Sequence, residues 1–193
     1  MLSPGSELFQ FDGQSYEQSY YQSEHTQIII DGCLALTDRD CPLQQSLAAI
    51  EGIYLKNGYQ GVIAAIAAGS FNLVIVDKKA NKVLFLNDFI GSIPLYYAKS
   101  NQGTVVSTNP VALFNSGLFP ITLDMTGVSS YAHLGYAFGS RHITRELNKL
   151  PANCCLEYDF HHKTSKIIKG HHNLFETFPE RKNYHRQKYG QLI

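Results

Sequence analysis

Hydrophobic positions along this chain fall into short runs separated by polar turns, and one run has the spacing of a helix. In CPLQQSLAAIEGIYLKNG the large apolar residues recur every three or four positions, which is typical of an amphipathic helix. Pro42 suits the first helical position, and Asn57-Gly58 is a stop signal. Two further helices are expected at 109–116 and 124–134. The apolar residues of the first pattern are Leu43, Leu47, Ile50 and Tyr54.

The other runs are rich in β-branched and aromatic residues and are bounded by turn-forming residues, so they predict strands. In TQIIIDGCLAL the strand is expected to be interrupted at Asp31-Gly32, which is a turn signal. The runs between residues 70 and 108 are joined by short polar loops, which predict an antiparallel meander. The other expected strands are 70–77, 82–88, 93–99, 104–108, 154–160 and 164–169.

Strands in consecutive runs, with helices grouped between them, indicate an α+β fold rather than a parallel βαβ sheet. The runs NLVIV and VLFL are apolar without alternation, so both faces of the central strands are expected to be buried. Residues 3–26 show no sustained periodicity and predict a loose lead-in or one weak hairpin. Within them, the tyrosine-rich stretch 15–23 favours an edge strand or lead-in over a stacking surface, because no basic residues are interleaved.

Composition and charge exclude several classes of function. The chain has 193 residues, of which 44% are hydrophobic and 17% charged, as expected for one globular domain. Lys+Arg and Asp+Glu number 16 each, so no electrostatic footprint for nucleic acid or an anionic membrane is expected. No apolar run reaches the roughly 20 residues of a bilayer span, and the start does not resemble a secretory signal. A cytoplasmic protein is therefore expected.

The cysteine and histidine pairs do not predict a metal site or a cofactor. Cys154-Cys155 lies on an expected strand, where neighbouring side chains point to opposite faces and do not converge on one ion. The pairs His161-His162 and His171-His172 are interpreted as a solvated turn and a polar linker. Cys33 and Cys41 are interpreted as structural thiols, because no His can be placed beside either.

Three sequence blocks carry a recognisable order of motifs. They read G-x-F-x-x-x-I-x-D, D-x-x-G-x-x-P-L-Y-Y and S-T-x-P-x-A-L, and a later run ends in L-E-Y-D. Together they resemble the N-terminal glutamine amidotransferase domain of the asparagine synthetase family, a class II amidotransferase of the Ntn-hydrolase type. The resemblance covers roughly residues 28–170. The matching residues are Gly69, Phe71 and Asp77 in the first block, Asp88, Gly91, Pro94, Leu95, Tyr96 and Tyr97 in the second, and Ser107, Thr108, Pro110, Ala112 and Leu113 in the third.

The resemblance implies a four-layer αββα sandwich of two antiparallel sheets, expected here without its N-terminal strands. It divides the chain into a polar lead-in at 1–27, an amidotransferase-like domain at 28–170, and a linker or helix at 171–193 that leads towards a synthetase domain. In complete members this domain releases ammonia from glutamine. A C-terminal ATP-pyrophosphatase domain then uses the ammonia to convert an adenylated aspartate into asparagine.

The resemblance also implies an active site that this sequence does not complete. The family nucleophile is an N-terminal Cys, whereas this chain begins Met1-Leu2-Ser3, and Leu2 is too bulky to favour removal of Met1. The family's oxyanion hole is an Asn-Gly-Glu turn, and the matching positions hold Asp31, Gly32 and Cys33. An ionised Asp offers only hydrogen-bond acceptors, so this change opposes the stabilisation of an oxyanion.

The position of the family Asp that meets the substrate's amino group falls near Ser46, which carries no carboxylate. No catalytic residue is therefore assigned. Asp31, Gly32 and Ser46 are interpreted as degenerate remnants of substrate binding. The motif residues interpreted as structural are Gly69, Asp77, Asp88, Gly91 and Pro94.

Three functional hypotheses follow from this pattern. The first is a pseudoenzyme: a non-catalytic scaffold for a synthetase domain in cis or in trans, as in the nucleophile-lacking beta-lactam synthetase and lasso-peptide cyclases. The second is the glutaminase domain of an asparagine synthetase whose true N-terminus lies upstream. The third is a free-standing interaction module, for which an exposed apolar face is expected. The sequence leaves open whether the chain forms a homo-oligomer. It contains no S-G-G-x-D-S loop, so no ATP chemistry is assigned to this chain.

Overall fold

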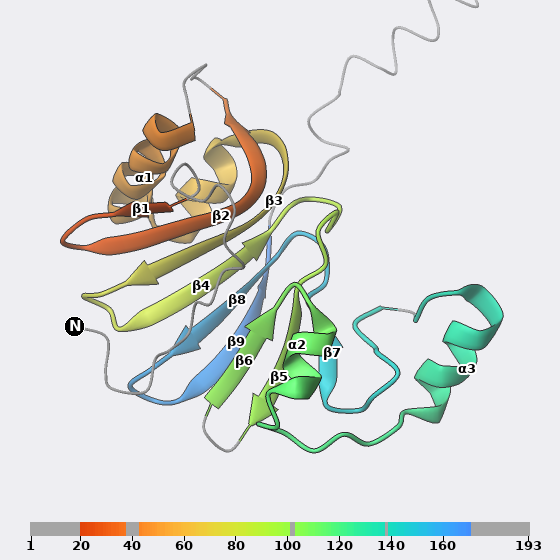
Figure 1. Ribbon diagram of the computed structural model, residues 1–193. Coiled ribbons are helices and arrows are strands. Elements are labelled where there is room, and N and C mark those ends of the chain that lie inside the picture. The colour runs from red at the N-terminus through yellow and green to blue at the C-terminus, as the bar shows by residue number, and fades with distance from the viewer. Residues whose placement is uncertain (1–19, 38–42, 101–102, 138, 171–193) are drawn as a thin grey trace, which may run out of the picture.

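The computed structural model describes residues 20–37, 43–100, 103–137 and 139–170, and within them the chain forms two antiparallel sheets (Figure 1). The larger sheet has the order β1-β2-β3-β4-β8-β9 and the smaller one the order β6-β5-β7. The strands of the larger sheet are β1 (Tyr20–Gln22), β2 (Thr26–Leu36), β3 (Ile66–Asp77), β4 (Lys82–Asn87), β8 (Cys154–Asp159) and β9 (Thr164–Lys169). The remaining elements are β5 (Tyr96–Ser100), β6 (Gly103–Ser107), β7 (Leu147–Lys149), α1 (Leu43–Ala65), α2 (Pro110–Asn115) and α3 (Met125–Leu134).

Three hydrophobic clusters separate four layers. The first lies between α1 and the larger sheet, where Leu47 and Ile50 pack against Leu73 and Ile75 of β3. The second lies between the two sheets and the third between the smaller sheet and α2. The fold class is therefore confirmed as an α+β sandwich in the order α1, larger sheet, smaller sheet, α2. The second cluster includes Phe85, Leu95, Leu150 and Leu156, and the third consists of Ala98, Leu113, Phe119 and Leu147.

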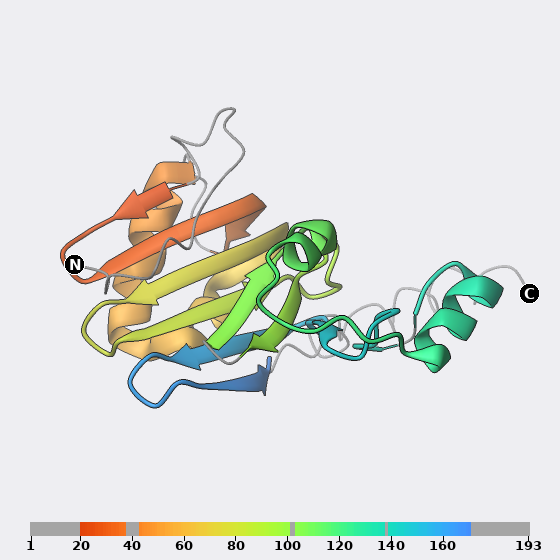
Figure 2. The same cartoon turned by 60° about the horizontal axis from the view of Figure 1, so that its bottom comes forward.

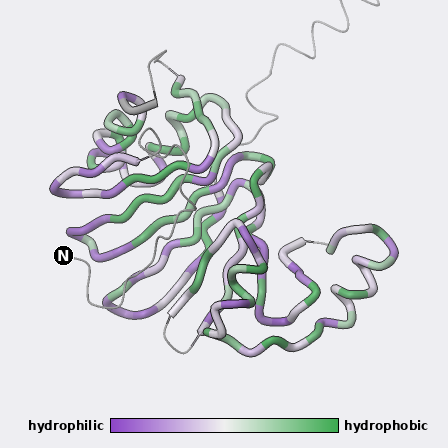
Figure 3. Tube along the Cα trace, viewed as in Figure 1, coloured by the Kyte–Doolittle hydropathy of each residue, from purple (hydrophilic) through white to green (hydrophobic). Residues whose placement is uncertain are grey.

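The layering explains why the central strands are apolar without alternation. In β3, Leu73 and Ile75 face the cluster under α1, whereas Val74 and Val76 face the cluster between the sheets. Figure 3 shows the resulting hydrophobic tracts in β3 and β4. A strand that is buried on both faces needs apolar residues at successive positions.

Helix α1 has the predicted break at Gly58, but its helical structure continues beyond the break. Gly58 has φ 66° and ψ −167°, which is outside the helical region, and a second helical segment then runs to Ala65. Val62 of this second segment is fully buried in the cluster under α1, so packing extends the helix past its stop signal. Pro42, the predicted first helical residue, lies outside the described residues.

Two predictions about strand connections are wrong. Strand β2 is not interrupted at Asp31-Gly32, because the twelve-residue β3 pairs with it throughout, with Asp31 opposite Asn72 and Gly32 opposite Phe71. The run 70–108 is not one meander either: β3 pairs with β4 in the larger sheet, and β5 pairs with β6 in the smaller one. The segment 88–95 therefore crosses from one sheet to the other.

Two peripheral elements, β1 and α3, differ in their packing. Tyr20 and Tyr21 belong to β1, which pairs with β2 at the edge of the larger sheet, and residues 15–19 of the tyrosine-rich stretch lie outside the described residues. Helix α3 stands away from both sheets on a long excursion between α2 and β7, as the two views in Figure 1 and Figure 2 show. None of the helices in the described ranges has the length and apolar character needed to cross a bilayer.

Candidate functional site

Asp31 and Cys33, which the resemblance predicts to lie in an oxyanion turn, are on the face of the larger sheet opposite α1. Ile28 and Ile30 of β2 face the cluster under α1, so the alternating residues Asp31 and Cys33 point to the other face. Both are exposed, and Asp31 lies directly across from Asn72 of β3. This part of β2 and β3 is bordered by the crossing segment 88–95.

Asp88 fixes the course of the crossing segment. Its side chain is completely buried and accepts hydrogen bonds from the backbone N–H of Phe71 (3.2 Å), Ile90 (3.0 Å) and Ser92 (3.1 Å), and from the Ser92 hydroxyl. Burial by itself would raise the pKa of Asp88, but the hydrogen bonds from Ser92, Ile90 and Phe71 outweigh it and lower the pKa below its usual value. The carboxylate is therefore ionised at neutral pH and committed to the fold.

The crossing segment is also bound to β3. The Ser70 and Ser92 hydroxyl oxygens are 2.5 Å apart, and the Asn72 side-chain amide donates to the carbonyl of Ile93 at 3.3 Å. The Oδ1 atom of Asn72 is buried and has no hydrogen-bond partner among the described residues. Gly91, with φ +63°, adopts the left-handed conformation that this tight segment requires.

Gly32 and Gly69 allow β2 and β3 to approach each other closely. Gly32 has φ +104°, and a Cβ atom there would lie 2.1 Å from the backbone oxygen of Ser70. Gly69 has φ +151°, and its Cβ would lie 2.5 Å from the backbone oxygen of Cys33. Both positions therefore require glycine for backbone reasons that are independent of any chemistry.

Ser46 lies in surroundings unlike those of Asp31 and Gly32. Ser46 is buried, at 4% exposure, in the first turns of α1, whereas Asp31 and Gly32 are exposed in the middle of β2. Its hydroxyl brings no charge to that region. Two motif residues remain. Pro94 is half-buried just before β5. Asp77 is the last residue of β3, and its carboxylate accepts hydrogen bonds from the Tyr54 hydroxyl (2.9 Å) and the Ala80 N–H (2.7 Å).

Sequence analysis missed two buried polar residues that connect distant segments. Asn87, next to Asp88, donates to the carbonyls of Leu150 and Pro151 and accepts from the Cys154 N–H at 2.9 Å. These bonds join the end of β4 to the start of β8. An Asn-Asp pair at a strand end was the only signal in the sequence.

The second missed residue is Glu51 of α1, which holds the β1–β2 hairpin. Its carboxylate accepts hydrogen bonds from the hydroxyls of Tyr21 (2.8 Å), Ser23 and Thr26 (2.8 Å). Burial acts to raise the pKa of Glu51, but the hydrogen bonds from Ser23, Thr26 and Tyr21, with the charge of His25, lower it overall. A carboxylate with three hydroxyl donors has a structural use and is not available to a substrate.

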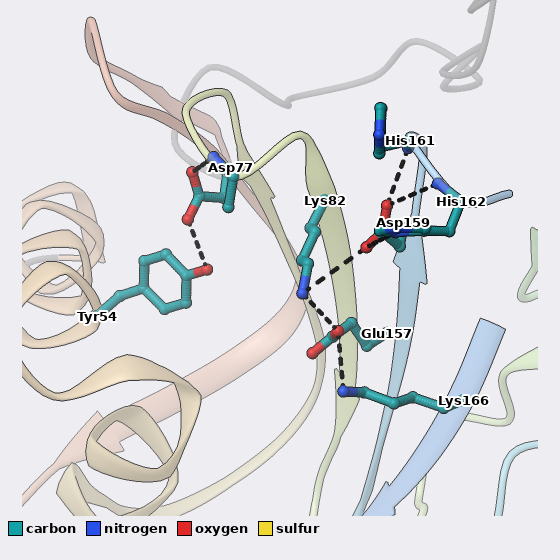
Figure 4. A network of polar contacts seen from close by, with 9 residues as sticks. Tyr54, Asp77, Lys82, Glu157, Asp159, His161, His162 and Lys166 are labelled. Carbon is teal, nitrogen blue, oxygen red and sulfur yellow. Dashed lines mark hydrogen bonds and ion pairs between the residues drawn. The ribbon is translucent and has the colours of Figure 1, made fainter. Parts of the chain in front are cut away.

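A further polar network lies along β4, β8 and β9 (Figure 4). Lys82 and Lys166 both contact Glu157 at 3.1 Å, and Asp159 accepts from His162 Nδ1 at 3.0 Å. The His162 side chain and the backbone N–H groups of His162 and His161 lower the pKa of Asp159 to about 2. The basic partners of these pairs are partly or largely exposed, so the pairs contribute little to stability. Within the described ranges, no three His, Cys, Asp or Glu side chains group together as metal ligands.

Comparison with known proteins identifies the family. The family model described as "Glutamine amidotransferase domain" matches residues 49–168, which is more than half of the chain. No curated protein matches the chain. Among solved structures, it is similar to the glutamine phosphoribosylpyrophosphate (PRPP) amidotransferase from B. subtilis complexed with ADP and GMP. The identity is 12% and the TM-score 0.47, over 79% of this chain and 31% of that chain, so this chain spans about a third of that protein's length. By the match over residues 49–168, the chain belongs to the glutamine amidotransferase domain family.

Proposed function

We propose that this chain is a glutamine amidotransferase-like domain without glutaminase activity. In this proposal it acts as a scaffold for an asparagine synthetase-like, ATP-dependent amide-forming domain, in cis or in trans. The observation that carries the proposal is the exposed carboxylate of Asp31 in β2. In this proposal Asp31 takes the place of the Asn in the family's oxyanion turn, where amide hydrolysis needs a hydrogen-bond donor.

The electrostatics at Asp31 oppose the hydrolysis of glutamine. The tetrahedral intermediate of amide hydrolysis carries a negative oxygen, which catalysis stabilises with N–H donors. An ionised carboxylate offers no donor, and two like charges about 4 Å apart repel by about 1 to 4 kcal/mol, depending on how much water separates them. No ion pair with another described residue neutralises Asp31. The nearby Gly32 amide alone would have to offset this repulsion.

Helix α1 provides no substitute anchor for the amino group of the substrate. Ser46 is buried and uncharged, and Glu51 is the only carboxylate in the helix. Because Glu51 accepts hydrogen bonds from Tyr21, Ser23 and Thr26, its release would disrupt the β1–β2 hairpin. The buried carboxylates of Glu51 and Asp88 therefore serve the fold. In this proposal, the substrate-binding positions Asp31 and Ser46 lack the hydrogen-bond donor and the carboxylate that glutamine would need.

The proposed scaffold role needs a stable sandwich but no cofactor of its own. The three hydrophobic clusters and the two buried carboxylates supply that stability. A reducing compartment, the cytoplasm in this proposal, suits the free thiols of Cys33, Cys154 and Cys155.

The test is a glutaminase assay on the purified chain. We expect no glutamine-dependent release of ammonia above buffer background, with or without a thiol alkylator. Ammonia release that an alkylator abolishes would contradict the proposal and favour an active glutaminase. In that case a Cys33→Ala variant decides whether the exposed thiol of Cys33 is the nucleophile.

The scaffold role has its own test. The reading frame around this chain should encode a domain with a pyrophosphate loop, either continuous with it or as a separate protein that forms a complex with it. The complex is expected to form its amide from an amine substrate or free ammonia, and not from glutamine. A complex that uses glutamine as its nitrogen source would contradict the role.

A further inference from the structure

We propose that the α3 arm, defined as residues 118–136, binds a second copy of this chain. The arm includes α3 and the segment that leads into it from α2. It stands apart from the two sheets in both views of the fold (Figures 1 and 2). This inference does not rest on the proposed loss of glutaminase activity.

The arm exposes an unusual number of large apolar side chains. Each of them is between 40% and 66% exposed, and Met125 is the most exposed of them. Tyr131 and Leu134 are three residues apart on α3, so they lie on one face of the helix. The exposed large apolar residues of the arm are Leu118, Ile121, Leu123, Met125, Tyr131, Leu134 and Tyr136.

The rest of the described chain covers little of this surface. The buried residue of α3 is Gly127, where a Cβ atom would lie 2.0 Å from the backbone oxygen of His142. An ion pair of 3.0 Å between Asp124 and Arg141 and a β-bridge from Leu123 to Thr144 hold the base of the arm. These contacts, with Phe119 buried in the third cluster, fix the base of the arm but leave the seven large apolar side chains named above at least 40% exposed.

The arm is also almost free of charge. From residue 110 to residue 140 the sequence contains one Asp, no Glu, no Lys and no Arg, although 17% of the whole chain is charged. The single charge is Asp124, which Arg141 neutralises. Depletion of charge together with exposed Tyr and Met is the composition that distinguishes the centre of a protein interface from ordinary surface.

A second copy is the occupant that fits an apolar surface without charge. In a two-fold symmetric dimer the same patch faces itself, so a patch with net charge would repel its copy, whereas this one would not. Large side chains that are half exposed offer roughly 100 Å² each, so seven of them offer about 700 Å² per copy. If all seven side chains face the partner, two copies bury about 1,400 Å², which lies within the range of stable, specific interfaces.

Sedimentation velocity on the full chain over about 1 to 100 µM tests the proposal. The expected result is a concentration-dependent shift from the 21.6 kDa monomer to a species of twice that mass. Leu134→Asp places a charge in the interface twice, once from each copy, and is expected to weaken dimerisation at least tenfold. An equimolar mixture of Leu134→Asp and Leu134→Lys is expected to recover part of the association.

Leu55→Asp is the matched control, because Leu55 of α1 is 52% exposed and Leu134 47% exposed. It is expected to leave dimerisation unchanged, and circular dichroism should show that both variants fold as the wild type does. A wild-type chain that stays monomeric up to about 100 µM would overturn the proposal. Equal weakening by Leu55→Asp and Leu134→Asp, or no weakening by Leu134→Asp, would also overturn it.

Discussion

Asp88 and Asp31 belong to the same sheet but have opposite surroundings. Asp88 follows β4, is completely buried and gives its whole carboxylate to the N–H and O–H groups of Phe71, Ile90 and Ser92. Asp31 lies in β2, two strands away, and its side chain is exposed to solvent.

The difference separates what the fold requires from what catalysis would require. The crossing of the chain from one sheet to the other depends on Asp88, because its carboxylate accepts the hydrogen bonds of Phe71, Ile90 and Ser92. Nothing in the described structure depends on the Asp31 side chain. The residue at position 31 can therefore change the chemistry of this face without changing the sandwich.

The largest effect is expected from Asp88→Ala. The substitution leaves the buried N–H group of Phe71 and the partly buried N–H groups of Ile90 and Ser92 without their acceptor, and a fully buried group in this state costs about 1 to 3 kcal/mol. We expect the free energy of unfolding to fall by about 3 to 5 kcal/mol. Urea unfolding followed by circular dichroism measures this change. A loss below about 1 kcal/mol would mean that water enters the site and that Asp88 does not hold the crossing.

Asp88→Asn is the companion variant, because it keeps the size of the side chain and removes its titration. The folded-state pKa of Asp88 is lowered, so its ionisation stabilises the fold above the unfolded pKa of about 3.9. That contribution is lost as the pH falls through the folded pKa. The difference in melting temperature between wild type and Asp88→Asn should therefore be greatest above about pH 5 and should narrow below about pH 4. A constant difference from pH 7 to pH 3 would contradict this account.

Gly32→Ala sharpens the comparison, because Gly32 is the direct neighbour of Asp31. Alanine is strained at φ +104°, and its Cβ would meet the Ser70 backbone oxygen, which cannot move without displacing β3. We expect a loss of about 2 to 3 kcal/mol in urea unfolding. Such a loss would show that the fold depends on the backbone conformation of Gly32, even though it does not depend on the side chain of Asp31.

Gly135→Ala controls for the effect of backbone conformation alone. Gly135 ends α3 with φ +77°, and a Cβ atom there meets nothing within 4 Å. The expected loss is about 1 kcal/mol, which is the cost of a left-handed conformation without a clash. If Gly32→Ala cost no more than Gly135→Ala, the close approach of β2 and β3 would not be a constraint.

The sequence predicts local features of this fold well because their causes are local. The break at Gly58 follows from a residue that readily leaves the helical region. The helix expected at 124–134 is observed at Met125–Leu134, where the side chain of Asp124 caps its N-terminus. The apolar runs alone predict that the central strands are buried on both faces, but they do not predict which sheet each strand joins. The αββα order of the layers was therefore predicted from the resemblance to the family.

The features that the sequence did not predict depend on residues far apart in the chain. Asp88 is held by Phe71, 17 positions earlier, and Glu51 by a hairpin 25 to 30 positions earlier. Asp31-Gly32 carries a strong turn signal, but pairing with β3 keeps it extended. Strand β7 has only three residues, Leu147–Lys149, so it shows no periodicity to detect.

The smallest effect on stability, and the sharpest test of the comparison, is expected from Asp31→Asn. Because the side chain is exposed and forms no ion pair with a described residue, the free energy of unfolding should change by no more than about 0.5 kcal/mol. The variant places an N–H donor at position 31. On the proposal that this position belongs to a degenerate oxyanion turn in a domain without a nucleophile, we expect no glutaminase activity, since a donor alone cannot open the amide. Urea unfolding and an ammonia assay on the same preparation measure both properties. A destabilisation above about 1 kcal/mol would show that Asp31, like Asp88, serves the fold, and the contrast between the two aspartates would be lost.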